Sequence, residues 1–323
     1  MEPWSKELAG RLDEHELDSA ALAGNPLGDP ARRPLWVYEP PGAQGATLPA
    51  IYLIQGFTGQ VDMWRNRSAF RPSVIELIDD LRAPARVVFV DAWTSLGGSQ
   101  FVDSPVVGDY HTYLCEDVVG FVDERYPTGA RAIAGKSSGG YGATITAMLR
   151  PDVFAGLATH AGDALFELCY LTEFPQVVRA LRDNYDGSYD AFWEDFRARP
   201  AFTKAADPAL VNTYAMAACY SAGELPFDVA TGRLKPDVWD RWLGWDPVRM
   251  VDAHADALRG LRAIYIDAGT RDEYFLDLGA EAFRRALERI GVTDVFFELF
   301  DAKHGSIEYR YPLALRYLAE RLQ

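Results

Sequence analysis

The chain has 323 residues, of which 49% are hydrophobic and 13% aromatic, so it can bury a large core. Its formal net charge of −15 repels nucleic acid and anionic membrane surfaces, and we expect neither as a partner. The three cysteines, Cys115, Cys169 and Cys219, have no CxxC spacing, so we expect buried thiols rather than disulfides or a metal site. The amino terminus lacks a basic segment followed by an apolar run, and no membrane-spanning stretch is visible, which favours a cytoplasmic location.

The first part of the chain carries apolar runs of strand length. Residues 1–34 are acidic and then rich in glycine and proline, so we expect an extended arm and turns lying against the body of the protein. Strand candidates follow at 35–38, 49–54 and 86–91. A glycine-rich turn beginning at Gln55 ends the second of them, and a long Gly/Ser loop at 94–110 follows the third. Near-continuous apolar runs of this kind are typical of strands covered on both faces. Helical spacing over 114–126 comes next.

The most informative motif is Gly135-Lys136-Ser137-Ser138-Gly139. A strand candidate at 131–134 precedes this Gly-x-Ser-x-Gly pattern, and a helical segment at 141–150 follows it and ends at Pro151. A strand, a sharp turn and a helix are what a nucleophile elbow requires, because small neighbours allow the strained turn to pack closely. The motif therefore predicts that Ser137 is a nucleophile. We assign no role to Lys136.

The alternation of strands and helices is interrupted after a strand candidate at 154–160. Residues 164–255 show no clear strand and are dense in aromatic side chains. We interpret them as a helical cap or lid over the sheet, in which most rings form a small core of their own and a few line an apolar pocket. Strand candidates then return at 261–267 and 295–300, with helical spacing over 278–290 and from Pro312 onwards. The pattern predicts one α/β domain over 1–323, with a mainly parallel central sheet flanked by helices.

A serine nucleophile needs a general base, and five histidines are available: His15, His111, His160, His254 and His304. In folds with this elbow the acid and the histidine follow the serine, which excludes His15 and His111. His304 lies just beyond the last strand, at the edge where sites on parallel sheets gather, and is the predicted base. His254 lies in a segment typical of a helix surface. His160 precedes any credible acid, and we place it in the pocket wall or behind it.

The acid is sought in the loop after the strand at 261–267. Asp272 is the favoured candidate, because a carboxylate that far along its loop can reach the loop of His304. Asp267, which ends the strand, and Glu273 remain as alternatives.

Two backbone amides are expected to form an oxyanion hole. One belongs to Ser138, directly after the nucleophile, and the other to the turn after the 49–54 strand, where we choose Phe57. The ends of the strands also suggest which residues frame the substrate pocket, namely the 94–110 loop and residues 160–163. The predicted pocket residues are Gln55, Trp93, Tyr110, His160 and Asp163.

These motifs together resemble the putative esterase (esterase D-like) family of the α/β-hydrolase superfamily, over roughly 20–160 and 258–320. The elbow at 135–143 resembles the family's Gly-His-Ser-Met-Gly-Gly-x-Gly-Ala. The segment 267–272 resembles its Asp-x-Gly-x-x-Asp, in which the second aspartate is the triad acid. The resemblance implies an α/β-hydrolase fold and a Ser137, Asp272 and His304 triad. S-formylglutathione hydrolases of this family have Gly-Leu-Thr-Cys where this chain has Gly56-Phe57-Thr58-Gly59, which counts against that activity.

The expected function is hydrolysis of a small to medium acyl or aryl ester through an acyl-enzyme. The expected partner is the small-molecule ester, and no metal or cofactor is implied. One alternative is an acyltransferase that uses the same acyl-enzyme. A less favoured alternative is a non-catalytic ligand-binding protein on the same scaffold, since a fold does not fix a function. The sequence leaves open whether the chain forms a homodimer.

Overall fold

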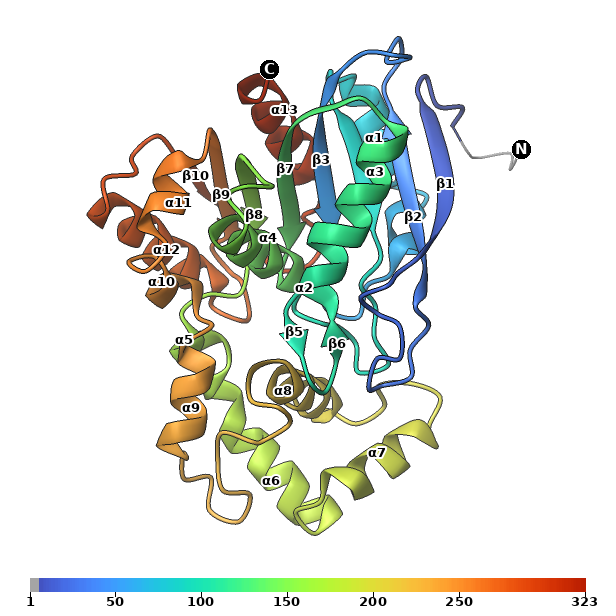
Figure 1. Cartoon of the computed structure of the whole chain (residues 1–323). Helices are drawn as coiled ribbons and strands as arrows, with labels where there is room; N and C mark the ends of the chain where they lie inside the picture. The colour runs from blue at the N-terminus through green and yellow to red at the C-terminus, as the bar shows by residue number, and fades with distance from the viewer. Residues whose placement is uncertain (1–5) are drawn as a thin grey trace.

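The computed structural model describes residues 6–323, which contain an eight-stranded sheet in the order β1-β2-β4-β3-β7-β8-β9-β10 (Figure 1). Its strands are β1 (Arg11–Asp18), β2 (Arg32–Glu39), β3 (Leu48–Ile54), β4 (Arg86–Val90), β7 (Thr128–Lys136), β8 (Gly156–His160), β9 (Ala263–Gly269) and β10 (Phe296–Phe300). Strands β4, β3, β7, β8, β9 and β10 run parallel to one another. At one edge of the sheet, β2 runs antiparallel to both of its neighbours, β1 and β4. A two-stranded ribbon pairs β5 (Asp103–Ser104) with β6 (Gly108–Asp109).

Helices cover both faces of the sheet (Figure 1). They are α1 (Val74–Leu81), α2 (Tyr110–Thr112), α3 (Val119–Arg125), α4 (Ser138–Leu149), α5 (Phe166–Cys169), α6 (Phe174–Tyr185), α7 (Tyr189–Arg197), α8 (Asp207–Tyr220), α9 (Pro236–Leu243), α10 (Pro247–Met250), α11 (Ala255–Gly260), α12 (Leu276–Arg289) and α13 (Tyr311–Arg321). Short helical turns are η1 (Val61–Arg65), η2 (Tyr113–Val118), η3 (Leu171–Glu173) and η4 (Glu308–Arg310).

Alternate residues of the central strands enter two different cores. Ile51 and Leu53 of β3 belong to the core that includes α1 and α13. Tyr52 and Ile54 belong to the core that includes α3, α4 and α12. Because both faces are covered, the strand reads as one continuous apolar run, which is why the sequence pattern identified it. The predicted α/β architecture with a mainly parallel sheet is confirmed.

The expected extended arm is wrong for part of its length. Residues Arg11–Asp18 form β1 and pair antiparallel with β2. As an edge strand with mostly charged, half-exposed side chains, β1 lacks the apolar run that marks the inner strands. Residues 1–5 of the expected arm lie outside the described residues. Helix α1 was also not predicted, although Ser73 and Glu76 form a capping box at its start, which is a recognisable signal.

The aromatic section between β8 and β9 is helical, as expected, and contributes α5 to α11. Figure 1 shows α6, α7, α8 and α9 gathered beneath the sheet. Its rings do not form a core of their own. Tyr141 of α4 contacts Phe166 and Tyr220 of this section, with ring centroids 6.0 Å and 5.8 Å away, and Tyr220 in turn contacts Trp242. The inserted helices therefore share one continuous core with the sheet. None of the helices within residues 6–323 is long and apolar enough to cross a membrane.

Candidate active site

Ser137 lies in a sharp turn between β7 and α4, with φ of 58° and ψ of −129°. A non-glycine residue in this conformation is strained, which is the mark of a nucleophile elbow. The turn packs so closely that a Cβ added at Gly139 would lie 2.4 Å from the carbonyl oxygen of Ile54. A Cβ added at Gly135 would lie 2.4 Å from the carbonyl carbon of Gly139. The backbone amide of Ser137 donates to the carbonyl of His160 at 3.0 Å, which ties the elbow to the end of β8.

His304 and Asp272 meet at the ends of β10 and β9. Nδ1 of His304 lies 2.8 Å from Oδ2 of Asp272, whose other oxygen accepts from the amide of Tyr274 at 2.8 Å. The ring of Tyr274 packs edge-on against the imidazole, with centroids 5.0 Å apart. Glu273 binds the backbone of His304 rather than its ring, accepting from its amide at 3.0 Å. Of the three acids considered, Asp272 is therefore the one that contacts the imidazole.

Asp267 binds a different set of partners in the core. One carboxylate oxygen lies 2.6 Å from Nδ1 of His160, and the other accepts from Arg310 Nε at 2.8 Å and from Tyr265 at 2.9 Å. Burial alone would raise the pKa of Asp267, but His160 and Arg310 more than offset it and hold that pKa below its ordinary value. Asp267 thus anchors the start of α13 to the end of β9.

His160 does not line the cavity, so of the two positions expected for it, in the pocket wall or behind it, the first is wrong. Alternation along β8 turns its ring toward α13, where it packs edge-on against Tyr311 with centroids 5.0 Å apart. The residue is fully buried, and its partner there is Asp267. A histidine at a strand end can point to either face, and the alternation of β8 decides which.

A cavity of about 330 Å³ contains both Ser137 and His304. Its wall is formed by Phe57, Thr58, Ser137, Ser138, Asp163, Cys169, Tyr170, Glu173, Phe202, Pro208, Asn212, Tyr274, Leu276 and His304. Among the described residues, no hydrogen bond joins Ser137 to His304. Such bonds are often long before substrate binds, so the shared cavity is the relevant observation.

Phe57 and Ser138, the two residues whose amides were expected to form an oxyanion hole, both line this cavity. Within residues 6–323, neither of them donates a hydrogen bond to another protein group. The next amide in the turn, that of Thr58, is occupied by the carbonyl of Gly97 at 2.7 Å. A Cβ added at Gly56 would lie 3.6 Å from Cβ of Ser137, so the turn approaches the elbow closely. This arrangement suits an oxyanion hole.

Three further predicted pocket residues, Gln55, Trp93 and Tyr110, do not line the cavity. In the orientation that satisfies both ends of its amide, buried Gln55 donates to the carbonyl of Val90 at 2.9 Å and accepts from the amide of Ala92 at 2.7 Å. Tyr110 is fully buried, and its hydroxyl contacts Arg33 and donates to the carbonyl of Trp93 at 3.2 Å. Neither these residues nor Trp93 lines the cavity.

The 94–110 loop supports the wall instead of forming it. No residue of this loop is among those that line the cavity. The carbonyl of Gly97 in this loop accepts a hydrogen bond from the amide of Thr58, and the side chain of Gln100 donates to Asp163 at 3.1 Å. The position of this loop after β4 did not by itself indicate a supporting role, because that role depends on contacts with Thr58 and Asp163 from other parts of the chain.

Residues 30–291 match the model of the family described as "Putative esterase". The chain belongs to this esterase family. It is accordingly a carboxylic ester hydrolase. No curated protein matches the chain.

Solved structures similar to this esterase cover nearly all of it. A ferulic acid esterase has a TM-score of 0.62 at 18% identity, covering 98% of this chain and 100% of its own. The fluorophosphonate-binding serine hydrolase F of Staphylococcus aureus has a TM-score of 0.61 at 16% identity, covering 96% of this chain and 98% of its own. An S-formylglutathione hydrolase from Agrobacterium tumefaciens has a TM-score of 0.59 at 18% identity, covering 99% of this chain and 98% of its own. These similarities establish the α/β-hydrolase fold.

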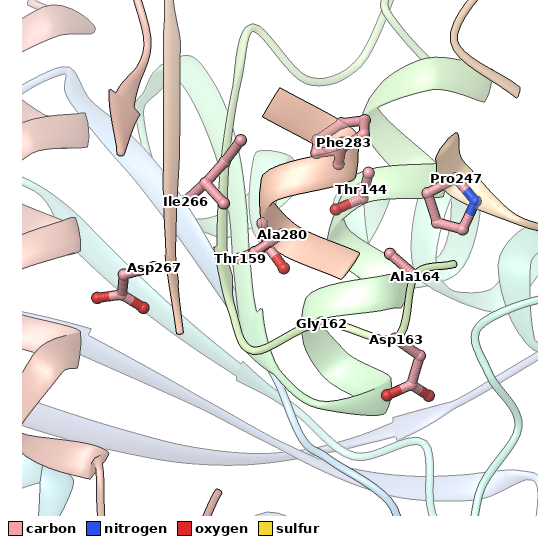
Figure 2. Close-up of a pocket in the computed structure, with 10 residues that line it drawn as sticks. All are labelled: Thr144, Thr159, Gly162, Asp163, Ala164, Pro247, Ile266, Asp267, Ala280 and Phe283. Carbon is pink, nitrogen blue, oxygen red and sulfur yellow. The ribbon is translucent and has the colours of Figure 1, made fainter. Parts of the chain in front are cut away.

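Asp163 of the esterase lines the cavity, as the sequence suggested. Its Oδ2 accepts from the hydroxyl of Tyr170 at 2.7 Å and from Gln100 Nε2, and the Ser138 hydroxyl lies 3.5 Å away. Burial raises the pKa of this carboxyl above its ordinary value. A second, smaller cavity of about 10 Å³ is also lined by Asp163. Figure 2 shows its lining residues, among which the carboxylates of Asp163 and Asp267 point away from the others.

Sequence reasoning missed most of the cavity wall of the esterase. The missed residues are Thr58, Cys169, Tyr170, Glu173, Phe202, Pro208, Asn212, Tyr274 and Leu276. Tyr170 and Phe202 belong to the aromatic section from which a few lining rings were expected. Glu173 and Asn212 carry no sequence signal, because their place depends on how α6 and α8 pack together.

Proposed function

We propose that this esterase hydrolyses a small to medium acyl or aryl ester through an acyl-enzyme formed on Ser137. In this mechanism His304 takes the proton of the Ser137 hydroxyl as it attacks the ester carbonyl, and then returns that proton to the leaving alcohol. Asp272 orients the imidazole and stabilises its cationic form. Water activated by His304 then cleaves the acyl-enzyme and regenerates the serine.

The amides of Phe57 and Ser138 stabilise the tetrahedral oxyanion in this proposal. Both residues line the cavity that contains the serine, and within residues 6–323 neither amide has another protein partner. Preorganised donors of this kind contribute about 2.7–4 kcal/mol each to transition-state stabilisation. The cavity volume of about 330 Å³ is near the lower end of the range of small-molecule sites, which supports a small or medium ester.

One observation carries the proposal. The strained serine of the elbow shares a cavity with an imidazole that is held by a buried carboxylate, with 2.8 Å between Nδ1 of His304 and Oδ2 of Asp272. Nucleophile, base and orienting acid are the elements that acyl transfer requires.

Turnover of p-nitrophenyl esters from acetate to decanoate tests the proposal. Ser137→Ala should lower kcat/KM by about 1,000-fold or more, because it removes the nucleophile. Ser95→Ala, at an exposed serine whose backbone amide rather than side chain binds Asp29, is the matched control and should retain wild-type turnover. Retention of more than a tenth of wild-type activity by Ser137→Ala would refute the assignment.

Product analysis with added alcohols separates hydrolysis from acyl transfer. The proposal predicts the free acid as the main product. A new ester as the main product in dilute alcohol would instead identify an acyltransferase that works through the same acyl-enzyme.

A further inference from the structure

The cavity wall carries two carboxylates, Asp163 and Glu173, and its only basic side chain is His304. Glu173 ends η3, and its Oε2 accepts from Asn212 Nδ2 at 3.1 Å. Asp163 is held by the neutral donors of Tyr170 and Gln100. Within residues 6–323, no lysine or arginine forms a salt bridge with either carboxylate. Buried carboxylates are normally paired with a cation, and neither the buried Asp163 nor the half-buried Glu173 has such a partner among the described lysines and arginines.

Asp163 is also only partly satisfied. It is 8% exposed, and its hydrogen bonds with described residues all involve Oδ2, which leaves Oδ1 without one. Burial raises the pKa of Glu173, and the nearby Asp163 raises it further. Burial and then Glu173 likewise raise the pKa of the Tyr274 hydroxyl. The negative charges of Asp163 and Glu173 therefore influence the pKa values of their neighbours in the cavity wall. The same charges favour binding of a cation in the cavity.

Aromatic rings complete the surroundings of these carboxylates. Tyr170, Phe202 and Tyr274 line the same cavity, and Phe202 and Tyr274 are 50% and 42% exposed. Ring faces attract organic cations, and the attraction adds to that of a carboxylate. A wall of rings with unpaired carboxylates suits an ammonium group on an otherwise apolar ligand better than it suits an anion.

We propose that the cavity selects esters that carry an alkylammonium or quaternary ammonium group, with Glu173 as its main counter-charge and Asp163 supporting it. This inference rests on the proposed function, since it names the substrate class of the same site. The cation can belong to the acyl part or to the alcohol part of the ester. A cation in either part would be recognised by the same carboxylates and rings, so the experiment includes one pair of esters for the acyl part and one pair for the alcohol part.

Two pairs of esters of matched shape test the proposal. The acyl arm compares p-nitrophenyl 6-aminohexanoate with p-nitrophenyl heptanoate, and the alcohol arm compares butyrylcholine with 3,3-dimethylbutyl butyrate. In at least one pair the wild type should prefer the cationic ester by about tenfold or more in kcat/KM. Glu173→Gln, which keeps the shape of the side chain, should lower that ratio by about tenfold. Glu194→Gln, the same charge change on the exposed face of α7, should leave the ratio unchanged.

The outcomes separate the two claims. Equal or greater turnover of the neutral ester in both pairs, or an unchanged ratio in Glu173→Gln, overturns the cation preference and leaves the esterase mechanism intact. Wild-type turnover by Ser137→Ala in the same assay overturns the proposed function. Failure of the wild type to hydrolyse any of the four esters counts against both.

Discussion

Two aspartates five residues apart hold two different histidines. Asp272 contacts His304 at the cavity, and Asp267 contacts His160 in the core. The sequence ranked Asp272 first because of its distance along the loop, and the contact with His304 agrees with that reasoning. The same sequence did not indicate that Asp267 belongs to a buried ionic cluster, because Arg310 lies 43 positions further along the chain.

Replacing Asp272 tests the catalytic pair at the residue scale. Asp272→Asn should lower kcat by about 10⁴-fold, because the amide no longer favours the correct tautomer of His304. Steady-state kinetics with the best p-nitrophenyl ester would measure the loss. A decrease of less than about tenfold would show that Asp272 does not orient the base.

Replacing Asp267 should affect stability instead. Asp267→Asn leaves Arg310 and His160 without their buried counter-charge, and breaking such a pair costs about 3–5 kcal/mol. Urea unfolding followed by tryptophan fluorescence would measure the change in the free energy of unfolding. An unchanged unfolding midpoint together with a large loss of kcat would mean that the roles of the two aspartates are reversed.

The pH dependence of that stability has a definite sign. The folded-state pKa of Asp267 lies below its unfolded value, so its stabilising effect is complete above about pH 4. It is then lost as the pH falls through the lowered folded-state pKa. The difference in unfolding free energy between the wild type and Asp267→Asn should therefore shrink below pH 4. A difference that stays constant from pH 7 to pH 3 would contradict the assignment.

At the scale of elements, the local sequence predicted β7, the nucleophile elbow and α4 well, because the geometry of the elbow depends on the glycines next to it in the chain. Gly139 has no room for a side chain, whereas a Cβ at Gly120 in α3 would meet nothing within 4 Å. Gly139→Ala should lower the free energy of unfolding by about 1–3 kcal/mol and impair catalysis. Gly120→Ala should raise it by about 0.5–1 kcal/mol, because alanine favours a helix.

Chemical denaturation of these two glycine variants provides the comparison. Opposite signs are expected from the same chemical substitution. If Gly139→Ala were as stable and active as Gly120→Ala, the close packing of the elbow against Ile54 would be wrong.

The ends of strands were easier to predict than the pocket wall. Ser137, Phe57, Asp272 and His304 all follow strands that the apolar runs marked, and parallel strands bring these ends to one edge. Six of the fourteen wall residues come from the segment that runs from α5 to α8, whose placement depends on contacts between distant parts of the chain. Gln55 and Tyr110 failed as pocket residues because a residue at a strand end can also serve as buried support.

At the scale of the whole molecule, the continuous core predicts that the inserted helices and the sheet unfold together. Trp242 is fully buried, contacts Tyr170 and Tyr220, and donates to the Ser221 hydroxyl at 2.9 Å. Trp242→Ala should lower the stability of the entire chain by about 3–5 kcal/mol. Differential scanning calorimetry should show one transition in both proteins, shifted to lower temperature in the variant.

Phe202→Ala is the matched control for that experiment. Phe202 is half-exposed in the same section, so its removal should change the free energy of unfolding far less. Two separate transitions, of which only one moves in Trp242→Ala, would show that the inserted helices fold independently of the sheet.

The central claim is that Ser137 is an activated nucleophile. Mass spectrometry of the protein treated with a fluorophosphonate tests it most directly, because such reagents react with activated serines rather than with ordinary ones. We predict one adduct per chain, located on the peptide that contains Ser137 and absent from Ser137→Ala. An adduct on another residue, or no adduct under conditions that label a known serine hydrolase, would contradict the account.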